Sequence, residues 1–186
     1  AVFKDYIKRR VRGEPTAYIT GCKEFMSLPF QVDPRVLIPR PDTETLVEEA
    51  IRLLRMRTGP HLVADVGTGS GAVAVSLAYY VPETRVYAVD IEPGAIELAR
   101  ANAARNRVED RVEFAVGSLL EPLSDLKLDL IAANLPYIPT PDLPKLPKEV
   151  KDYEPWLALD GGTDGLEYYR RLVEQAVNVL KPGGFL

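Results

Sequence analysis

The sequence predicts an α/β fold with a parallel, doubly wound sheet, and three observations support this. Short apolar segments alternate with segments of helical periodicity. Strands separated by helices of this length form right-handed βαβ units, with helices on both faces. The first strand runs into the glycine-rich turn Gly67–Gly71, and polar residues such as Asp90 and Asn134 follow later strands. Ligands of such sheets bind beyond the carboxyl ends of the strands.

Apolar periodicity and chain breakers define the elements of the second part of the chain. We expect strands at 62–66, 85–90, 111–116 and 128–133. We expect helices at about 70–80, 93–106 and 166–180. A further strand is expected to begin at Gly184. The polar groups at the strand ends should therefore converge on one edge of the sheet.

The first part of the chain has a different pattern. Residues 2–12 predict an amphipathic helix, and we interpret its basic side chains as a solvated helix end. The β-prone runs 17–20 and 28–32 flank a glycine and a short polar stretch, which predicts a hairpin.

Proline and glycine organise the segment that leads to the sheet. The prolines of 36–41 predict an extended chain, because each disfavours helix in the residue before it. Asp42 or Thr43 is expected to cap a helix that ends near 58–60. His61, the only histidine, follows Gly-Pro and is interpreted as a surface residue of a turn.

Composition excludes several classes of protein. The length suits one domain with or without a small appendage, and 46% hydrophobic residues suffice for a packed core. A single cysteine, Cys22, excludes an internal disulfide and a cysteine-based zinc site, and we expect no metal. No segment has the length of a membrane span or the pattern of a signal peptide, so a cytoplasmic location is expected. The net charge of −4 argues against a broad nucleic-acid face.

The glycine turn predicts a small-molecule site. Glycines allow a sharp turn and a close approach of a ligand to the main chain, and a helix start adds unpaired N–H groups. Gly67, Gly69 and Ala72 fit the G-x-G-x-x-A form of the dinucleotide fingerprint. Gly67, Gly69 and Gly71 also fit the G-x-G-x-G turn of S-adenosylmethionine-dependent methyltransferases. Asp90 does not separate the two ligands, since both offer ribose hydroxyls.

The segment Asn134-Leu135-Pro136-Tyr137 follows the fourth strand and favours methyl transfer. Asn134 offers an amide oxygen, and Leu135 offers a carbonyl that the neighbouring proline keeps out of a regular ladder. Two adjacent acceptors match the two hydrogens of a planar NH2 group. Tyr137 offers a flat face against which that group could stack. The alternative is an ordinary proline-bearing loop after a strand.

These residues resemble a known family. Asn134–Tyr137 is similar to the N-P-P-Y or N-[LI]-P-Y motif of amino-directed methyltransferases, and 65–71 is similar to their cofactor loop. Three further stretches resemble the release-factor glutamine methyltransferases, the HemK/PrmC family, and the second is the most specific. They are 12–21, 37–44 (Leu-Ile-Pro-Arg-Pro-Asp-Thr-Glu), and Glu154-Pro155 with 161–166.

The resemblance implies a Rossmann-like class I methyltransferase that moves a methyl group from S-adenosylmethionine to a glutamine side chain of a peptide chain release factor. It implies that 1–34 is the end of an N-terminal substrate-recognition region with a hairpin and the remnant of a helical domain. It implies that 35–186 is the cofactor-binding catalytic domain, without its C-terminal strands. We expect the natural protein to continue at both ends.

The resemblance also implies roles for individual residues. The cofactor site comprises Asp65, Gly67, Thr68, Gly69, Ser70, Gly71, Asp90, Ser118, Leu119 and Asn134. The catalytic and substrate pocket comprises Asn134, Leu135, Pro136 and Tyr137. Many relatives have proline at position 135 and aspartate at position 118. Because leucine also occurs at position 135 in enzymes that methylate rRNA adenine, the substrate is less defined than the reaction.

Three other functions remain open from the sequence. An adenine-N6 methyltransferase acting on DNA or RNA would share the residues Asn134–Tyr137, but it would need a basic groove or an added recognition domain. An NAD-dependent oxidoreductase would fit the glycine turn and leave Asn134–Tyr137 without a role. A binding-only fragment would retain the pocket without turnover.

Overall fold

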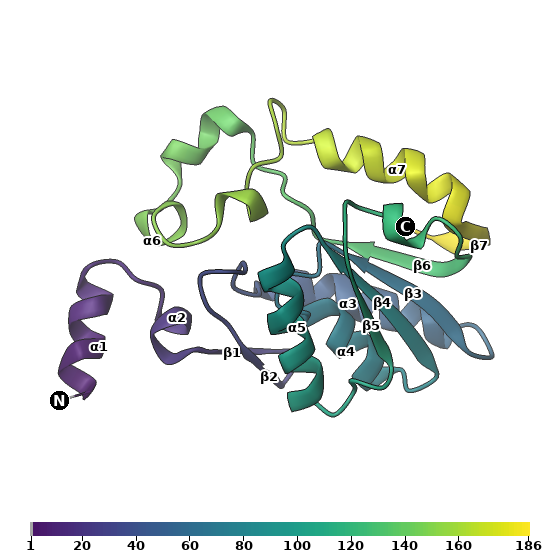
Figure 1. Ribbon diagram of the computed structural model, residues 1–186, viewed down its shortest axis with the longest axis horizontal. Helices are drawn as coiled ribbons and strands as arrows, with labels where there is room; N and C mark the ends of the chain where they lie inside the picture. Colours follow the sequence, from purple (N-terminus) through teal and green to yellow (C-terminus); the bar gives the residue numbers. More distant parts are fainter. Residues whose placement is uncertain (1) are drawn as a thin grey trace.

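A computed structural model describes residues 2–186 and has a five-stranded parallel sheet at its centre (Figure 1). The strand order is β5-β4-β3-β6-β7, and each neighbouring pair is parallel. The strands are β3 (His61–Val66), β4 (Thr84–Asp90), β5 (Val112–Val116), β6 (Leu128–Ala133) and β7 (Leu180–Phe185). The order reverses direction between β3 and β6, where an open α/β sheet forms its ligand crevice.

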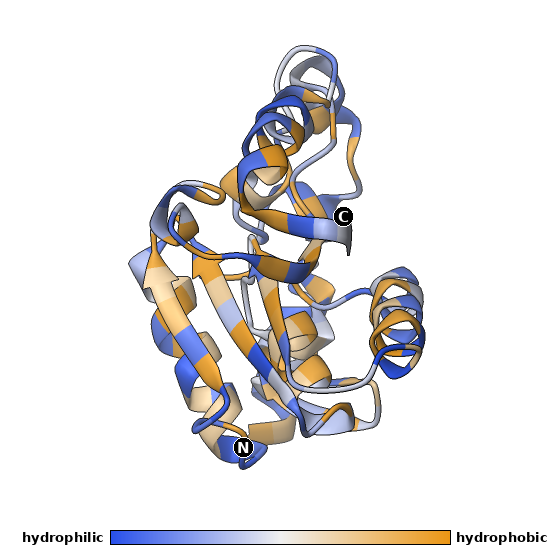
Figure 2. Ribbon diagram, turned by 90° about the vertical axis from the view of Figure 1, so that its right-hand side faces the viewer, coloured by the Kyte–Doolittle hydropathy of each residue, from blue (hydrophilic) through white to orange (hydrophobic). Residues whose placement is uncertain are grey.

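Helices cover both faces of the sheet, as the sequence predicts (Figure 1). One face carries α3 (Pro41–Arg55), α4 (Ala72–Tyr80) and α5 (Pro93–Arg105). The other carries α7 (Glu167–Val179), whose Leu172 packs against β3 and β6. Figure 2 shows hydrophobic colour along the strands, whereas the outer helices carry hydrophobic and hydrophilic residues together. This is the patterning of a sheet buried on both faces.

The N-terminal part forms α1 (Val2–Val11), α2 (Thr16–Thr20) and the hairpin β1 (Cys22–Phe25) to β2 (Leu28–Gln31). The expected strand over 17–20 is wrong, because these residues form a helix. Pro15 precedes the helix in an extended conformation, and Gly21 ends it in the left-handed region at φ 69°. One helical turn between these breakers buries Tyr18 and Ile19 more completely than an exposed hairpin strand would.

Two expectations at the entry to the sheet are also corrected. The third helix begins at Pro41 and not after a cap at Asp42 or Thr43, because proline at the first helical position loses no intrahelical hydrogen bond. His61 is buried and opens β3, since its N–H donates to Glu83 O at 3.2 Å and strand pairing starts there.

The chain between β6 and α7 lies over the carboxyl end of the sheet (Figure 1). It contains α6 (Lys148–Lys151). Of the three 3-10 turns among residues 2–186, two lie in this segment, at Thr140–Lys145 and Trp156–Ala158. The third, Glu121–Leu123, follows β5. The last strand begins at Leu180, four residues before the expected Gly184, and it contains a register irregularity against β6.

Candidate active site

Most of the residues expected in the site line one pocket at the carboxyl ends of β3, β4, β5 and β6. The pocket is open on one side, and its empty space of about 1160 Å³ includes solvent. Expected residues that line it are Asp65, Gly67, Thr68, Gly69, Ser70, Asp90, Ser118, Leu119, Asn134, Leu135 and Pro136. Gly71 and Tyr137 do not line it. The strand ends therefore converge as the sequence predicts.

Three glycines of the turn after β3 adopt conformations that side chains disfavour. Gly67, Gly69 and Gly71 have φ values of 74°, 53° and 81°. A Cβ on Gly71 would lie 3.1 Å from the Cβ of Ala99, so this glycine lets the turn pack against α5. A Cβ on Gly67 would lie 3.0 Å from Leu135 Cδ2, so this glycine lets the two walls of the pocket approach each other.

Asp65 fixes the glycine turn through buried hydrogen bonds. Its carboxylate is buried and accepts hydrogen bonds from Thr68 Oγ1 at 2.6 Å and from Ala74 N at 3.0 Å. Burial raises the pKa of Asp65 to about 6, against the effect of these two hydrogen bonds. Asp65 thus joins the end of β3, the turn and the first residues of α4.

Asp90 lies at the end of β4 and also holds the turn. Its Oδ2 accepts from Gly69 N at 2.8 Å, and its Oδ1 accepts from Glu92 N at 3.0 Å. A carboxylate has about four acceptor sites, so each oxygen retains capacity for a ligand hydroxyl. Because Asp90 lines the pocket, that capacity is available to a ligand there.

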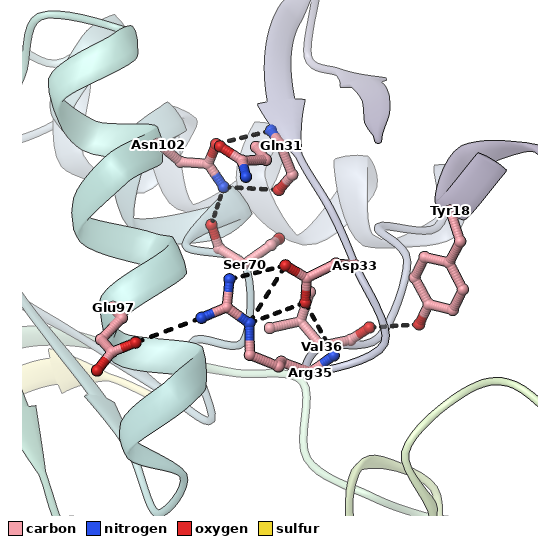
Figure 3. A network of polar contacts seen from close by, with 8 residues as sticks. All are labelled: Tyr18, Gln31, Asp33, Arg35, Val36, Ser70, Glu97 and Asn102. Atoms are coloured by element: carbon pink, nitrogen blue, oxygen red, sulfur yellow. Dashed lines mark hydrogen bonds and ion pairs between the residues drawn. The ribbon is translucent and has the colours of Figure 1, made fainter. Parts of the chain in front are cut away.

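A residue that the sequence analysis does not single out connects the N-terminal hairpin to the turn (Figure 3). Asn102 of α5 is fully buried. Its Nδ2 donates to Ser70 O at 2.8 Å and to Gln31 O at 2.9 Å, and its Oδ1 accepts from Gln31 N at 2.7 Å. All polar atoms of the Asn102 side chain are engaged, so one side chain anchors both β2 and the glycine turn.

Arg35 forms part of the pocket wall in the same region (Figure 3). Its guanidinium binds Asp33 through two nitrogens, at 2.9 and 2.7 Å, and contacts Glu97 at 3.3 Å. The hydroxyl of Tyr18 donates to Val36 O at 2.6 Å, which holds the same segment. These contacts fix the extended chain before α3 against α5.

Asn134 and Leu135, which carry the two predicted acceptors, are each contacted by a hydroxyl of a helix residue. Asn134 Nδ2 donates to Thr43 Oγ1 of α3 at 3.1 Å. The carbonyl of Leu135 accepts from the hydroxyl of Tyr169 of α7 at 3.1 Å. Among residues 2–186 no protein donor occupies Asn134 Oδ1, and a carbonyl with one partner retains a second lone pair. Both groups can therefore still accept a hydrogen bond from a ligand.

Tyr137 departs from the expected arrangement. Its side chain is 63% exposed and lies outside the pocket lining. The cause is backbone pairing just after it, because Ile138 N donates to Leu159 O at 3.0 Å and Gly161 N donates to Ile138 O at 2.8 Å. The backbone of Tyr137 is also packed tightly against Gly165, where no Cβ would fit. In this structure the tyrosine ring does not face the pocket.

The segment 37–44, the most specific part of the family resemblance, forms a wall of the pocket. Arg40 pairs with Glu154, a buried carboxylate whose other oxygen accepts from Ile38 N at 3.2 Å. Glu44 Oε1 accepts from Met26 N of the hairpin at 2.8 Å. The segment is thus held at both ends by carboxylates.

Comparison with known proteins was made against this geometry. A family described as "Methyltransferase domain" matches residues 63–153. The release factor glutamine methyltransferase of Moorella thermoacetica is 52% identical over 184 residues, covering 99% of this chain and 64% of that protein. The protein of the same name from Geobacter sulfurreducens is 50% identical over 188 residues, covering 100% and 64%.

The chain is similar to release factor glutamine methyltransferases over nearly its whole length. The resemblance that the sequence motifs indicate is therefore confirmed. The chain spans about 64% of the length of these two relatives.

Solved structures confirm the Rossmann-like methyltransferase fold of this chain. The hMettl16 catalytic domain, solved in complex with a 3′UTR hairpin, aligns with a TM-score of 0.66 at 16% identity, covering 89% of this chain and 64% of that chain. Ribosomal protein L11 methylase from Lactobacillus delbrueckii subsp. bulgaricus aligns with a TM-score of 0.56 at 26% identity, covering 83% and 64%.

Within residues 2–186, no cluster of three histidine, cysteine, aspartate or glutamate side chains is arranged to hold a metal ion. No helix in the described part of the chain is long and apolar enough to cross a membrane.

Proposed function

We propose that the protein transfers a methyl group from S-adenosylmethionine to the side-chain amide nitrogen of a glutamine in a peptide chain release factor. One observation carries this proposal. Asn134 and Leu135 present two free acceptor positions in the same pocket as the glycine turn and Asp90. The names of the relatives support the substrate, and Asn134–Tyr137 supports the reaction.

The cofactor half of the pocket fits S-adenosylmethionine. We infer that the turn 67–71 binds its methionine part, that Asp90 accepts its ribose hydroxyls, and that Ser118 and Leu119 flank its adenine. The buried carboxyl of Asp65 and the carboxylate of Asp90 suit a ligand with a positive sulfur. When bound, this cofactor supplies an electrophilic methyl group.

The acceptor half orients a weak nucleophile. The lone pair of an amide nitrogen is delocalised into its carbonyl, so the nitrogen reacts only when it is held in a suitable orientation. Asn134 Oδ1 and the Leu135 carbonyl bind the two hydrogens of the substrate NH2 and direct the nitrogen into the pocket. Their dipoles also stabilise the positive charge that develops on nitrogen.

No general base is needed before transfer, because the amide nitrogen reacts without prior deprotonation. The only histidine, His61, begins β3, whereas the pocket lies at the carboxyl end of that strand. His61 is therefore not placed to act as a base in the pocket. The proton that the nitrogen loses afterwards can leave to solvent through the open mouth of the pocket.

We also infer which role each part of the chain has. Residues 1–34 are proposed as the end of a substrate-recognition region, and 35–186 as the cofactor-binding catalytic domain. The hairpin within 1–34 is bound to α5 through Asn102, which supports a fixed relation between the two regions.

A methyl-transfer assay tests the proposed function. The protein is incubated with methyl-labelled S-adenosylmethionine and either a release factor, DNA or RNA. Label on a glutamine of the release factor, located by mass spectrometry, is the expected result. Label on adenine would establish the nucleic-acid alternative instead. Thermal stabilisation by NAD and not by S-adenosylmethionine would favour an oxidoreductase.

A further inference from the structure

The most specific motif of the sequence, 37–44, contributes a hydroxyl to the acceptor half of the pocket. Thr43 belongs to the first turn of α3, and its N–H donates to Arg40 O at 3.0 Å. Arg40 in turn is paired with the buried Glu154. These contacts fix the first turn of α3 and with it the position of Thr43. Thr43 Oγ1 accepts a hydrogen bond from Asn134 Nδ2 at 3.1 Å.

A second hydroxyl reaches the same site from the opposite face of the sheet. Tyr169 lies on α7 and is half-buried, and its hydroxyl donates to the Leu135 carbonyl at 3.1 Å. Thr43 and Asn134 are 91 residues apart, and Tyr169 and Leu135 are 34 apart. One hydroxyl thus comes from each face of the sheet, and the two contact the amide nitrogen of Asn134 and the carbonyl of Leu135.

We propose that Thr43 and Tyr169 are positioning residues that set the orientation of the two acceptor oxygens toward the substrate amide. The proposal rests on the proposed function, because it explains how the acceptors of that reaction are oriented. Neither residue is placed in contact with the reacting atoms.

The physical reason is clearest for Asn134. An asparagine amide can rotate so that either its oxygen or its NH2 group faces the pocket. An NH2 group facing the substrate NH2 would place donor against donor and bind nothing. The contact of Thr43 Oγ1 with Nδ2 restrains the Asn134 side chain in an orientation that leaves Oδ1 without a protein partner among residues 2–186. Tyr169 acts on a carbonyl that cannot rotate freely, so its effect is smaller.

Steady-state kinetics with matched variants tests the proposal. Thr43→Val removes the hydroxyl while keeping the shape, and it should lower kcat by about 10-fold, with the cofactor Kd within about 2-fold. Thr43→Ser keeps the hydroxyl and should restore most of kcat. Thr45→Val is the control, because Thr45 is exposed in the same helix. Tyr169→Phe should lower kcat about 3-fold, and Tyr79→Phe is its exposed control.

The outcomes separate this proposal from the proposed function. A Thr43→Val variant with wild-type kcat overturns it, as does equal loss of activity in Thr43→Val and Thr43→Ser. A parallel loss of cofactor affinity and melting temperature also overturns it, since that pattern is merely structural.

A second measurement does not depend on turnover. The side-chain NH2 resonances of Asn134, assigned by their loss in Asn134→Asp, should shift in Thr43→Val and stay unchanged in Thr45→Val. If the wild-type protein does not methylate a release factor, the proposed function fails. The NMR spectrum then decides by itself whether Thr43 orients Asn134. Unchanged Asn134 resonances in Thr43→Val would then refute the positioning role.

Discussion

The two halves of the pocket are built in different ways. In the cofactor half, the turn after β3 is held by main-chain and buried side-chain hydrogen bonds to Asp65, Asp90 and Asn102. In the acceptor half, Asn134 and Leu135 are held by single hydroxyl contacts from α3 and α7. Several hydrogen bonds fix the conformation of the cofactor half, whereas a single side-chain hydrogen bond holds each of Asn134 and Leu135.

This difference suits the two ligands. A cofactor that binds in the same way in every turnover needs a rigid binding site, which the turn after β3 provides. Under the proposed function, the substrate amide belongs to a large partner and has to enter and leave through the open side of the pocket. Variants of the acceptor half should therefore affect kcat, and variants of the cofactor half should affect cofactor affinity and stability.

The largest effect is expected from Asn134→Ala. Loss of one acceptor that stabilises the developing charge should lower kcat by about 100-fold or more. The affinity for S-adenosylmethionine, measured by calorimetry, should stay within a few-fold, because the turn is held independently. Asn178→Ala, an exposed asparagine of α7, serves as the control. Wild-type turnover in Asn134→Ala would remove the distinction between the two halves.

Asp90→Ala should act mainly on cofactor affinity. A hydrogen bond to a charged group contributes about 1.5–3 kcal/mol, so the Kd for S-adenosylmethionine should rise about 10- to 100-fold. Calorimetric titration measures this change, with the exposed Asp125→Ala as reference. An unchanged Kd would count against the ribose contact.

Asn102→Ala should lower the free energy of unfolding. The change leaves the buried Ser70 carbonyl and the Gln31 main chain without this partner, at a cost of about 1–3 kcal/mol. Urea denaturation measures the loss, and Asn178→Ala should change stability little. Equal stability of both variants would contradict a role for Asn102 in anchoring the turn.

The last prediction concerns the pH dependence of stability at Asp65. Burial raises the pKa of its carboxyl from 3.8 to about 6, so the folded state binds more protons than the unfolded state between these values. The contribution of Asp65 to stability is therefore full below pH 4 and is lost as pH rises through 6. The difference in unfolding free energy between wild type and Asp65→Asn should fall over that range. A difference that is flat or rises with pH would contradict the assignment.

Much of the sheet could be predicted from the sequence, because apolar runs bounded by breakers determine a buried parallel strand. The strand Leu128–Ala133 matches its prediction at both ends. The run 17–20 was misassigned because β-prone residues also fill one buried helical turn when Pro15 and Gly21 enclose them. Local propensity cannot separate these cases.

The candidate site also has a part that the sequence predicts and a part that it does not. The convergence of Gly67, Asp90 and Asn134 follows from the parallel arrangement of the strands, which the sequence predicts. The contacts of Thr43 and Tyr169 do not, because they join helices from opposite faces of the sheet and carry no local signal. The outward position of Tyr137 likewise depends on pairing with a segment more than 20 residues away.

A crystal structure with S-adenosylhomocysteine tests the central claim most directly. The account predicts the ligand's sulfur beside the turn 67–71, its ribose hydroxyls on Asp90, and Asn134 Oδ1 with the Leu135 carbonyl facing the space in front of the sulfur. A ligand bound elsewhere, or Asn134 turned away from that space, would contradict it.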